Sequence, residues 1–339
     1  MQLIAAIWTF SLASSLNGLR VATGFSFIGT SVHSNPPSHS QHRSNEQKSG
    51  FHLSSTRSSS FNTPNKIVTP KIMSDSNNNN VRVFTSPFLL LEDPPEQAKR
   101  RTALVILNSP IQNPPSPLFQ KLWSSSFIKI CADGGANRLY KANPELIPDL
   151  VRGDLDSLQD DVRKFYEAKG VQIERDPNQD NNDLDKALSA LKVEDNNSSS
   201  LQVVVYGGFG GRFDQEMASM QALFIWSEHF QHNILIVDDN TSAFLIPAGM
   251  RYEIRLPRYG TSPDMSVLGE GPTCGLIPLG CPCERVVTTG FRWNLDGSVP
   301  LQFGGLVSTS NYVEEELVTI ETSHPLIFTT EIVSGMDTF

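Results

Sequence analysis

Acidic side chains gather at turn positions in the middle of this 339-residue chain. Asp133 follows an apolar run and precedes two glycines, and Asp154 and Asp156 lie two residues apart within the segment 153–157. In an extended segment, residues at i and i+2 lie on the same side, so these two carboxylates could share one cation. Converging carboxylates repel one another unless a hard cation joins them, and Mg²⁺ is usual where phosphates supply the other oxygens. The pattern therefore predicts a magnesium and phosphate site.

More acidic residues precede a helical pattern that begins near Leu184. Asp176, Asp180 and Asp183 lie in this segment. Aspartate also favours turns and helix N-caps for purely local reasons, so each residue taken alone has this plain structural alternative. The alternative is weaker for Asp154 and Asp156 considered together with Asp133 and Asp183.

The segment 207–215 is rich in glycine and reads Gly-Gly-Phe-Gly-Gly-Arg-Phe-Asp-Gln. It joins an expected strand to an expected helix, where glycines let backbone N–H groups approach a phosphate. Arg212 could pair with phosphate oxygens. The segment has neither the P-loop pattern nor the dinucleotide pattern of three spaced glycines. A tight turn that packs the helix against the sheet is the alternative interpretation.

Two segments near the C-terminus could bind a flat heterocycle. Trp293 offers a large apolar face, and the segment 306–311 is dense in small hydroxyl and amide side chains. Core packing for Trp293 and an ordinary turn for 306–311 are the alternatives. The cysteines at 274, 281 and 283 lack the spacing of a zinc site, and we expect free thiols there.

The elements that must position these residues follow from the apolar pattern. Helical patterns, among them 184–191 and 213–224, alternate with short apolar runs typical of buried strands, at 103–107, 128–131, 201–206 and 234–237. This alternation predicts an α/β domain with a mostly parallel sheet, in which ligands sit at the carboxyl ends of strands. After about residue 243, two-residue alternation and frequent Pro and Gly predict an all-β sandwich or barrel.

The N-terminal part differs from the rest in charge and composition. The first 74 residues hold one acid and six bases, whereas the remaining residues carry a net charge of −14. We expect a disordered leader and linker over 1–83, an α/β domain over 84–242 and a β domain over 243–339. If the leader is a targeting segment, the protein goes to a plastid or mitochondrion; if translation starts at Met73, the protein stays cytoplasmic.

Composition also excludes several classes. A net charge of −9 argues against a general nucleic-acid binder, which needs a basic face. Four cysteines are too few for a disulfide scaffold. No apolar run reaches the length that a membrane-spanning helix needs, so we expect none.

The motifs together resemble those of thiamin pyrophosphokinases of the eukaryotic type. Seven blocks follow in that family's order, at 131–140, 153–157, 178–186, 210–215, 275–280, 288–295 and 306–311. The resemblance covers about residues 84–333. It implies transfer of a pyrophosphoryl group from ATP, as co-substrate, to the primary alcohol of thiamin, giving thiamin diphosphate and AMP. It further implies Mg²⁺, an α/β catalytic domain, a β-sandwich thiamin-binding domain, and a homodimer with sites at the subunit interface.

The resemblance also implies residue roles. The metal and phosphate cluster would comprise Asp133, Asp154, Asp156 and Asp183, with Asp154, Asp156 and Asp183 as the Mg²⁺ ligands. Gln179, Asp180 and Lys186 would lie beside that cluster. The nucleotide side would be lined by Gly208, Arg212, Asp214 and Gln215. The thiamin pocket would be lined by Trp293, Ser308, Thr309, Ser310 and Asn311. Either Asp133 or Asp180 could accept the proton of the alcohol.

Some positions depart from the family pattern. Leu155 and Leu184 replace phenylalanine, which should preserve burial. Asn182 replaces threonine and keeps a polar cap, while Asp185 adds a charge near the cluster. Two other functions stay open: a non-catalytic thiamin or nucleotide-binding regulator, and a Mg²⁺-dependent nucleotide enzyme with another acceptor. The intact acidic cluster favours catalysis, and Trp293 with the hydroxyl-rich segment favours thiamin.

Overall fold

A computed structural model describes residues 81–85, 101–194, 201–231, 233–256 and 269–333. The predicted leader and the choice between the two start sites lie outside these residues, except for the leader's last three. Among the described helices, none is long and apolar enough to cross a membrane.

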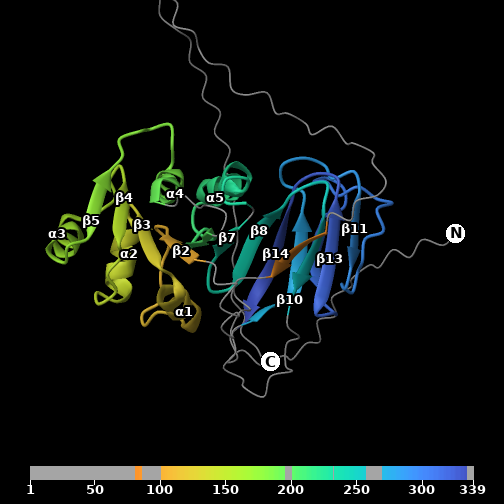
Figure 1. The fold of residues 1–339 in the computed structure, drawn as a ribbon, viewed down its shortest axis with the longest axis horizontal. Coiled ribbons are helices and arrows are strands. Elements are labelled where there is room, and N and C mark those ends of the chain that lie inside the picture. Colours follow the sequence, from red (N-terminus) through yellow and green to blue (C-terminus); the bar gives the residue numbers. More distant parts are fainter. Residues whose placement is uncertain (1–80, 86–100, 195–200, 232, 257–268, 334–339) are drawn as a thin grey trace, which may run out of the picture. The chain divides into compact units, whose positions relative to one another are not determined.

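The first part of the described chain alternates strands with helices (Figure 1). In chain order the elements are β2 (Arg101–Ile106), α1 (Pro117–Ser125), β3 (Ile128–Ala132), α2 (Gly135–Ala142), β4 (Leu150–Gly153), α3 (Asp160–Ala168), β5 (Gln172–Arg175), α4 (Asp183–Glu194), β6 (Leu201–Tyr206), α5 (Phe213–Trp226) and β7 (Ile234–Val237). The six strands are parallel and lie in the order β7-β6-β2-β3-β4-β5. Parallel pairing brings all their carboxyl ends to one edge of the sheet.

Both faces of this sheet are covered, which explains why its central strands are continuously apolar. In β2, Leu104 and Ile106 face a core that α1, α2 and α3 complete. Ala103 and Val105 face the opposite core, to which α4 and α5 contribute. Successive strand residues point to opposite faces, so one six-residue strand supplies both cores.

The second part is antiparallel except for one strand pair (Figure 1). Its elements are β8 (Thr241–Ile246), β9 (Arg251–Arg255), β10 (Gly269–Ile277), β11 (Val286–Thr289), β12 (Ser308–Tyr312), β13 (Leu317–Thr322) and β14 (Leu326–Val333). β1 (Val81–Thr85) pairs parallel with β9 in a four-stranded sheet of order β1-β9-β13-β11. The other sheet carries β12-β10-β14-β8. Phe244 and Phe328 from it share a core with Tyr252 and Ile320 from the four-stranded sheet. The prediction of an α/β part followed by a β sandwich is confirmed.

One sheet runs through both parts. β8 pairs with β7 on one side and with β14 on the other, so the parallel sheet continues into the sandwich as ten strands. β8 extends across the predicted boundary at 242, and β1 extends across the boundary at 83. The residue limits of the domains stay a prediction.

Candidate active site

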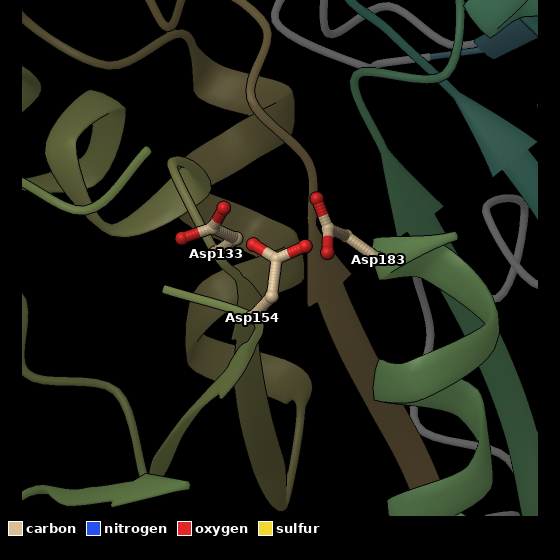
Figure 2. Close-up of side chains that lie close together, drawn as sticks. All are labelled: Asp133, Asp154 and Asp183. Atoms are coloured by element: carbon tan, nitrogen blue, oxygen red, sulfur yellow. The ribbon is translucent and has the colours of Figure 1, made fainter. Parts of the chain in front are cut away.

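Three carboxylates meet at the carboxyl edge of the parallel sheet. Asp133 follows β3, Asp154 follows β4, and Asp183 is the first residue of α4. One oxygen from each lies within 4.8 Å of the others, and Figure 2 shows the three side chains close together. Asp133 and Asp154 are adjacent because the neighbouring parallel strands β3 and β4 end side by side, and Asp183 joins them from the first residue of α4.

Asp133 is the buried member of the cluster, with 1% of its surface exposed. Its Oδ2 accepts a hydrogen bond from Ser157 N at 3.3 Å, while Oδ1 has no hydrogen-bond partner among the described residues. Burial, assisted by the charges of Asp183 and Asp154, raises the pKa of Asp133 to about 6. A buried carboxylate oxygen without a donor is costly, so this atom fits a cation ligand.

Asp133 also requires a glycine beside it. A side chain at Gly153 would bring a Cβ within 2.6 Å of the Asp133 Cβ. Asp133 itself adopts a positive φ of 41°, a conformation that aspartate tolerates better than most residues. The two glycines that follow it close the turn into α2.

Lys186 supplies a positive charge to the cluster from the second turn of α4. Its side chain is 2% exposed, and Nζ lies 3.2 Å from Asp154 Oδ2 and 3.4 Å from Asp183 Oδ1. Burial alone would lower the pKa of Lys186, but the hydrogen bond to Asp154 and the charge of Asp183 outweigh it, and this pKa is raised. Lys186 is therefore a fixed cation inside the cluster.

The other two carboxylates differ in their environments. Burial would raise the pKa of Asp154, but the Asp156 N–H and the Lys186 ammonium bond to its carboxylate and hold the pKa below its ordinary value. Burial raises the pKa of Asp183, and the charge of Lys186 only partly offsets this effect.

Asp156 borders the three-carboxylate group without belonging to it. Leu155 adopts a positive φ of 66°, so the segment 154–156 is not extended, yet Asp156 stays beside Asp154: its N–H donates to Asp154 Oδ1 at 3.2 Å, and its side chain helps to hold the pKa of Asp154 low. Asp156 is exposed and accepts a hydrogen bond from Ser157 Oγ at 3.0 Å. The resemblance and the sequence spacing gave Asp156 as a ligand; that assignment stays a prediction, while the three carboxylates that lie within 4.8 Å of one another are Asp133, Asp154 and Asp183.

Gln179 and Asp180 lie in the exposed loop between β5 and α4. Their hydrogen bonds stay within the loop: Asp180 N donates to Asn178 Oδ1 at 2.9 Å, and Gln179 Nε2 donates to Pro177 O at 3.5 Å. The loop leads directly into Asp183, so both residues border the cluster along the chain.

The two departures in the α4 segment have clear structural roles. Asn182 caps α4, because its Oδ1 accepts a hydrogen bond from Asp185 N at 2.8 Å. The predicted polar cap is thus present. Asp185 accepts a hydrogen bond from Trp226 Nε1 at 2.7 Å, which ties α4 to the end of α5. Its charge is engaged there rather than in the three-carboxylate group.

An open cleft lies beside the cluster. Asp183, Asn182 and Gln215 line it together with backbone of the glycine segment, and Asn108 and Ser109 line it from the segment after β2. A Cβ at Gly208 would lie 2.4 Å from Ile236 Cγ2, so only glycine lets this backbone pack against β7. Arg212 and Asp214 are exposed and form an ion pair with N···O distances of 2.5 and 3.0 Å.

The predicted heterocycle-binding segments adjoin one another in the β part. Trp293 is 58% exposed, so core packing does not explain this side chain. Asn311 is buried; its Oδ1 accepts hydrogen bonds from the N–H groups of Trp293 and Tyr312, at 3.2 and 2.8 Å. Its Nδ2 donates to Trp293 O at 2.9 Å and to Ser308 Oγ at 3.2 Å. Asn311 therefore fixes the backbone that carries Trp293 beside Ser308.

The hydroxyl-rich segment is largely accessible. Thr309 and Ser310 are exposed, Ser308 is half-buried, and Ser310 adopts a positive φ of 54°. Further exposed apolar side chains lie in the neighbouring loop, namely Val299, Phe303 and Leu306. The cysteines at 274, 281 and 283 are free thiols, the first and last of them buried.

Comparison with known proteins places this site in a family. Two family models match the chain: "Thiamin pyrophosphokinase, catalytic domain" over residues 119–236, and "Thiamin pyrophosphokinase, vitamin B1 binding domain" over 251–327. Thiamine pyrophosphokinase 1 of rice (Oryza sativa subsp. japonica) is 38% identical over 70% of this chain and 89% of its own. The chain belongs to the thiamin pyrophosphokinase family. Thiamine pyrophosphokinase 2 of Arabidopsis thaliana, another relative, is 37% identical over 74% of this chain and 93% of its own.

Solved thiamin pyrophosphokinases share the fold. The enzyme from Candida albicans superposes with a TM-score of 0.62 at 27% identity, over 76% of this chain and 95% of its own. The catalytic-domain model of the family covers Asp133, Asp154 and Asp183, whereas the vitamin B1 model covers Trp293 and Asn311. The two candidate regions thus belong to different parts of the family architecture.

Three polar residues that the motif analysis passed over also shape this candidate site. Asn137 of α2 donates to Ser157 O at 2.7 Å and accepts from Gln159 N at 3.0 Å, which holds the loop that carries Asp154. Asn108 accepts a hydrogen bond from Arg138 Nε at 2.8 Å. Ser109 Oγ donates to Gly207 O at 2.5 Å. The sequence signal that could have identified Asn108 as a site residue was its position directly after an apolar strand.

Proposed function

We propose that this chain transfers the pyrophosphoryl group of ATP to the hydroxyethyl oxygen of thiamin, giving thiamin diphosphate and AMP. Family membership supports the reaction, since relatives above 35% identity carry the name thiamine pyrophosphokinase. The observation that carries it in this chain is the cluster of Asp133, Asp154 and Asp183 at the carboxyl edge of the parallel sheet, beside an open cleft.

The proposed reaction is a displacement at the β-phosphorus. The thiamin oxygen forms a bond to that phosphorus, the bond to the oxygen bridging the α- and β-phosphates breaks, and AMP leaves with its electron pair. The alcohol proton passes to a carboxylate. Little covalent work falls to the protein, so positioning and charge neutralisation dominate catalysis.

The donor set fits Mg²⁺. All three candidate ligand groups are carboxylates, which Mg²⁺ prefers, and the buried Asp133 Oδ1 has no other partner among the described residues. Asp133, Asp154 and Asp183 would hold the ion, and Asp156 is a further proposed ligand from the adjacent loop. Bound there, Mg²⁺ would neutralise charge on the phosphate oxygens of ATP.

The cleft beside the cluster is the proposed ATP site. Gly208 and Gln215 line it directly, and Arg212 and Asp214 lie just outside at the start of α5. Arg212 is occupied by Asp214, so it must exchange that partner before it can bind a phosphate. Asp214 and Glu216 in the first turn of α5 oppose an anion at that helix end, which places the polyphosphate nearer the metal ligands.

Two carboxylates are candidates for accepting the alcohol proton. The pKa of Asp133 is raised to about 6, close to the range suited to a general base near neutral pH. A carboxylate that ligates a divalent cation is a weaker base, so Asp133 serves as a base only if it does not bind the metal. Asp180 in the exposed loop is then the proposed base.

Thiamin is proposed to bind in the β part, against the exposed face of Trp293 and the hydroxyl groups of Ser308, Thr309 and Ser310. We also propose a homodimer in which these residues complete the site of a second copy. Exposure of Trp293 and of the apolar Val299, Phe303 and Leu306 nearby supports burial against another surface.

The decisive experiment incubates the purified full chain with ATP, Mg²⁺ and thiamin. AMP and thiamin diphosphate should appear in a one-to-one ratio, as measured by chromatography. The appearance of ADP with thiamin monophosphate would contradict pyrophosphoryl transfer. Binding of thiamin without any turnover, in a chain that also binds Mg²⁺ and ATP, would support the non-catalytic regulator instead.

A further inference from the structure

Lys186 occupies the space between two of the three carboxylates. Its Nζ contacts Asp154 Oδ2 and Asp183 Oδ1 at 3.2 and 3.4 Å, and its side chain is 2% exposed. Packing around a buried side chain leaves the ammonium group little freedom to move away. The Lys186 charge is therefore a permanent part of the cluster rather than a mobile surface charge.

The third carboxylate, Asp133, remains for another cation to neutralise. Asp133 Oδ2 accepts a hydrogen bond from Ser157 N, and Oδ1, although buried, has no partner in the described part of the chain. Since one oxygen of Asp133 lies within 4.8 Å of oxygens from Asp154 and Asp183, a single ion can reach all three. Lys186 already occupies the side of Asp154 and Asp183 that it contacts, so a metal ion cannot bind on that side.

Charge balance then limits how many ions the cluster can hold. The three ionised carboxylates of the group and the Lys186 ammonium sum to −2, which one divalent cation neutralises; the charge of Asp156 beside the group is exposed and therefore screened by solvent and salt. In two-metal sites the ions lie about 3.5–4 Å apart and share bridging ligands. A second ion bridging Asp154 and Asp183 would meet the Lys186 ammonium at short range, and like charges a few ångströms apart repel by several kcal/mol at an effective dielectric constant of about 20.

We propose that Lys186 acts as a built-in monovalent cation that limits the nucleotide-free cluster to one divalent ion. Any further ion then enters only together with the polyphosphate of the nucleotide, whose own oxygens supply the missing negative charge. The inference rests on the proposed function only in taking Mg²⁺ as the ion and ATP as its carrier. The number of ions bound before nucleotide arrives depends on the chain's own residues.

The test counts Mn²⁺, a paramagnetic substitute for Mg²⁺, on the full-length chain by electron paramagnetic resonance at pH 8 without nucleotide. Wild type should bind one ion per chain. Lys186→Met, which keeps the length of the side chain without its charge, should bind a second ion and hold the first roughly tenfold more tightly. Lys186→Arg keeps the charge and should stay at one ion. Lys164→Met removes an exposed lysine of α3 and controls for net charge, with no expected change.

Clear outcomes would overturn the proposal. A wild-type chain that binds two Mn²⁺ ions, or none, without nucleotide contradicts it. A folded Lys186→Met chain that still binds one ion with unchanged affinity also contradicts it. If Lys186→Met does not fold, as judged by circular dichroism, wild type and Lys186→Arg must both bind one ion for the proposal to stand. Adding α,β-methylene-ATP, which resists cleavage, should then raise the wild-type count above one.

This test is separate from that of the proposed function. A wild-type chain that holds one Mn²⁺ ion but forms no AMP and no thiamin diphosphate would refute the reaction while leaving the role of Lys186 intact. A wild-type chain with full activity that binds two Mn²⁺ ions before nucleotide would refute the role of Lys186 while leaving the proposed reaction intact.

Discussion

Asp133 is buried beside the acidic groups of Asp183 and Asp154, and these two features make its carboxyl group costly to ionise without a metal. Its pKa in the folded chain is about 6, against an ordinary value of 3.8. The folded state therefore binds the proton more tightly than the unfolded state. Stability of the metal-free chain falls as pH rises from about 4 to about 6 and stays reduced above that range.

Asp133→Asn should reverse this loss. At pH 8 in EDTA we expect the variant to melt about 6–12 °C above wild type, because two pKa units correspond to about 3 kcal/mol. Near pH 4 the advantage should vanish, and activity should be lost at every pH. Thermal melts from pH 4 to pH 8 measure the effect, with the exposed Asp160→Asn as control. A melting difference that is the same at both ends of this range would contradict the assignment.

Asp183→Asn and Asp156→Asn should differ in their effects on metal binding. Asp183 belongs to the three-carboxylate group, so Asp183→Asn should lose both Mn²⁺ binding without nucleotide and about a hundredfold in turnover. Asp156 lies outside that group and is proposed to join the metal ligands only when nucleotide is bound, so Asp156→Asn should keep Mn²⁺ binding without nucleotide and lose turnover only. Paramagnetic resonance and steady-state kinetics on both variants provide the comparison. Equal loss of Mn²⁺ binding in the two variants would place Asp156 among the ligands of the nucleotide-free site.

At the scale of elements, the first turn of α4 determines how the cluster is assembled. Asn182 caps the helix, Asp183 begins it and Lys186 follows one turn later, so one cap fixes two charged side chains. Residues three apart lie on the same helix face, which is why Lys186 reaches Asp183. Asp185 points elsewhere and binds Trp226 of α5.

Asn182→Ala should therefore affect stability and metal binding together. Loss of the cap costs about 1 kcal/mol and should lower the melting temperature by roughly 2–4 °C. Mn²⁺ affinity should also fall, because the helix start that carries Asp183 loosens. Asn182→Thr, which restores a capping oxygen, should recover both properties. Recovery of the melting temperature without recovery of Mn²⁺ affinity would show that the cap does not position Asp183.

The loop that carries Trp293 depends in the same way on Asn311 of β12. Asn311→Asp replaces the donor to Trp293 O with an oxygen acceptor, so the two oxygens repel. We expect the KM for thiamin to rise about tenfold with the KM for ATP unchanged, since a buried polar group left without its hydrogen-bond partner costs about 1–3 kcal/mol. Steady-state kinetics and Trp fluorescence report the change, and Glu315→Gln, which alters an exposed side chain between β12 and β13, is the control with no expected change. A parallel rise in both KM values would indicate general loosening of the fold.

At the scale of the whole molecule, the ten-stranded sheet links the catalytic and sandwich parts through β7 and β8. The proposed metal ligands come from the parallel end of that sheet, and the proposed thiamin residues come from the segments around β12 at its other end. In the order β12-β10-β14-β8-β7-β6-β2-β3-β4-β5, six strands lie between β12 and β3. A second copy of the chain is the proposed means of bringing the two regions together.

Mixing two inactive variants tests that arrangement. Asp183→Asn and Trp293→Ala chains should each be inactive alone, but a random mixture should recover about a quarter of wild-type activity if each site uses both copies. The recovery arises because a mixed dimer retains one site built from two unmodified regions. Light scattering should give the mass of a dimer for each variant. A mixture of proven heterodimers without any recovered activity would place both regions in one copy.

Much of the fold could be predicted from sequence because its signals are local. Continuous apolar strands such as β6, with helices between them, indicated a sheet covered on both faces, and two-residue alternation indicated the sandwich. Residue types gave the chemistry as well, since carboxylates at strand ends favour a hard cation. Motif order then indicated the family.

Only the tertiary structure decided which of these side chains meet. The adjacency of β3 and β4 and the start of α4 brought Asp133, Asp154 and Asp183 together, whereas Asp156, after the left-handed Leu155, borders that group. The contact of Lys186 with Asp154 and the two hydrogen bonds between Asn311 and Trp293 join residues 32 and 18 positions apart in the chain. The sequence determines residue types and the hydrophobic periodicity of each element, because both are local properties. The set of metal ligands and the charge balance around them depend on distances between side chains, which only the packing of the folded chain fixes.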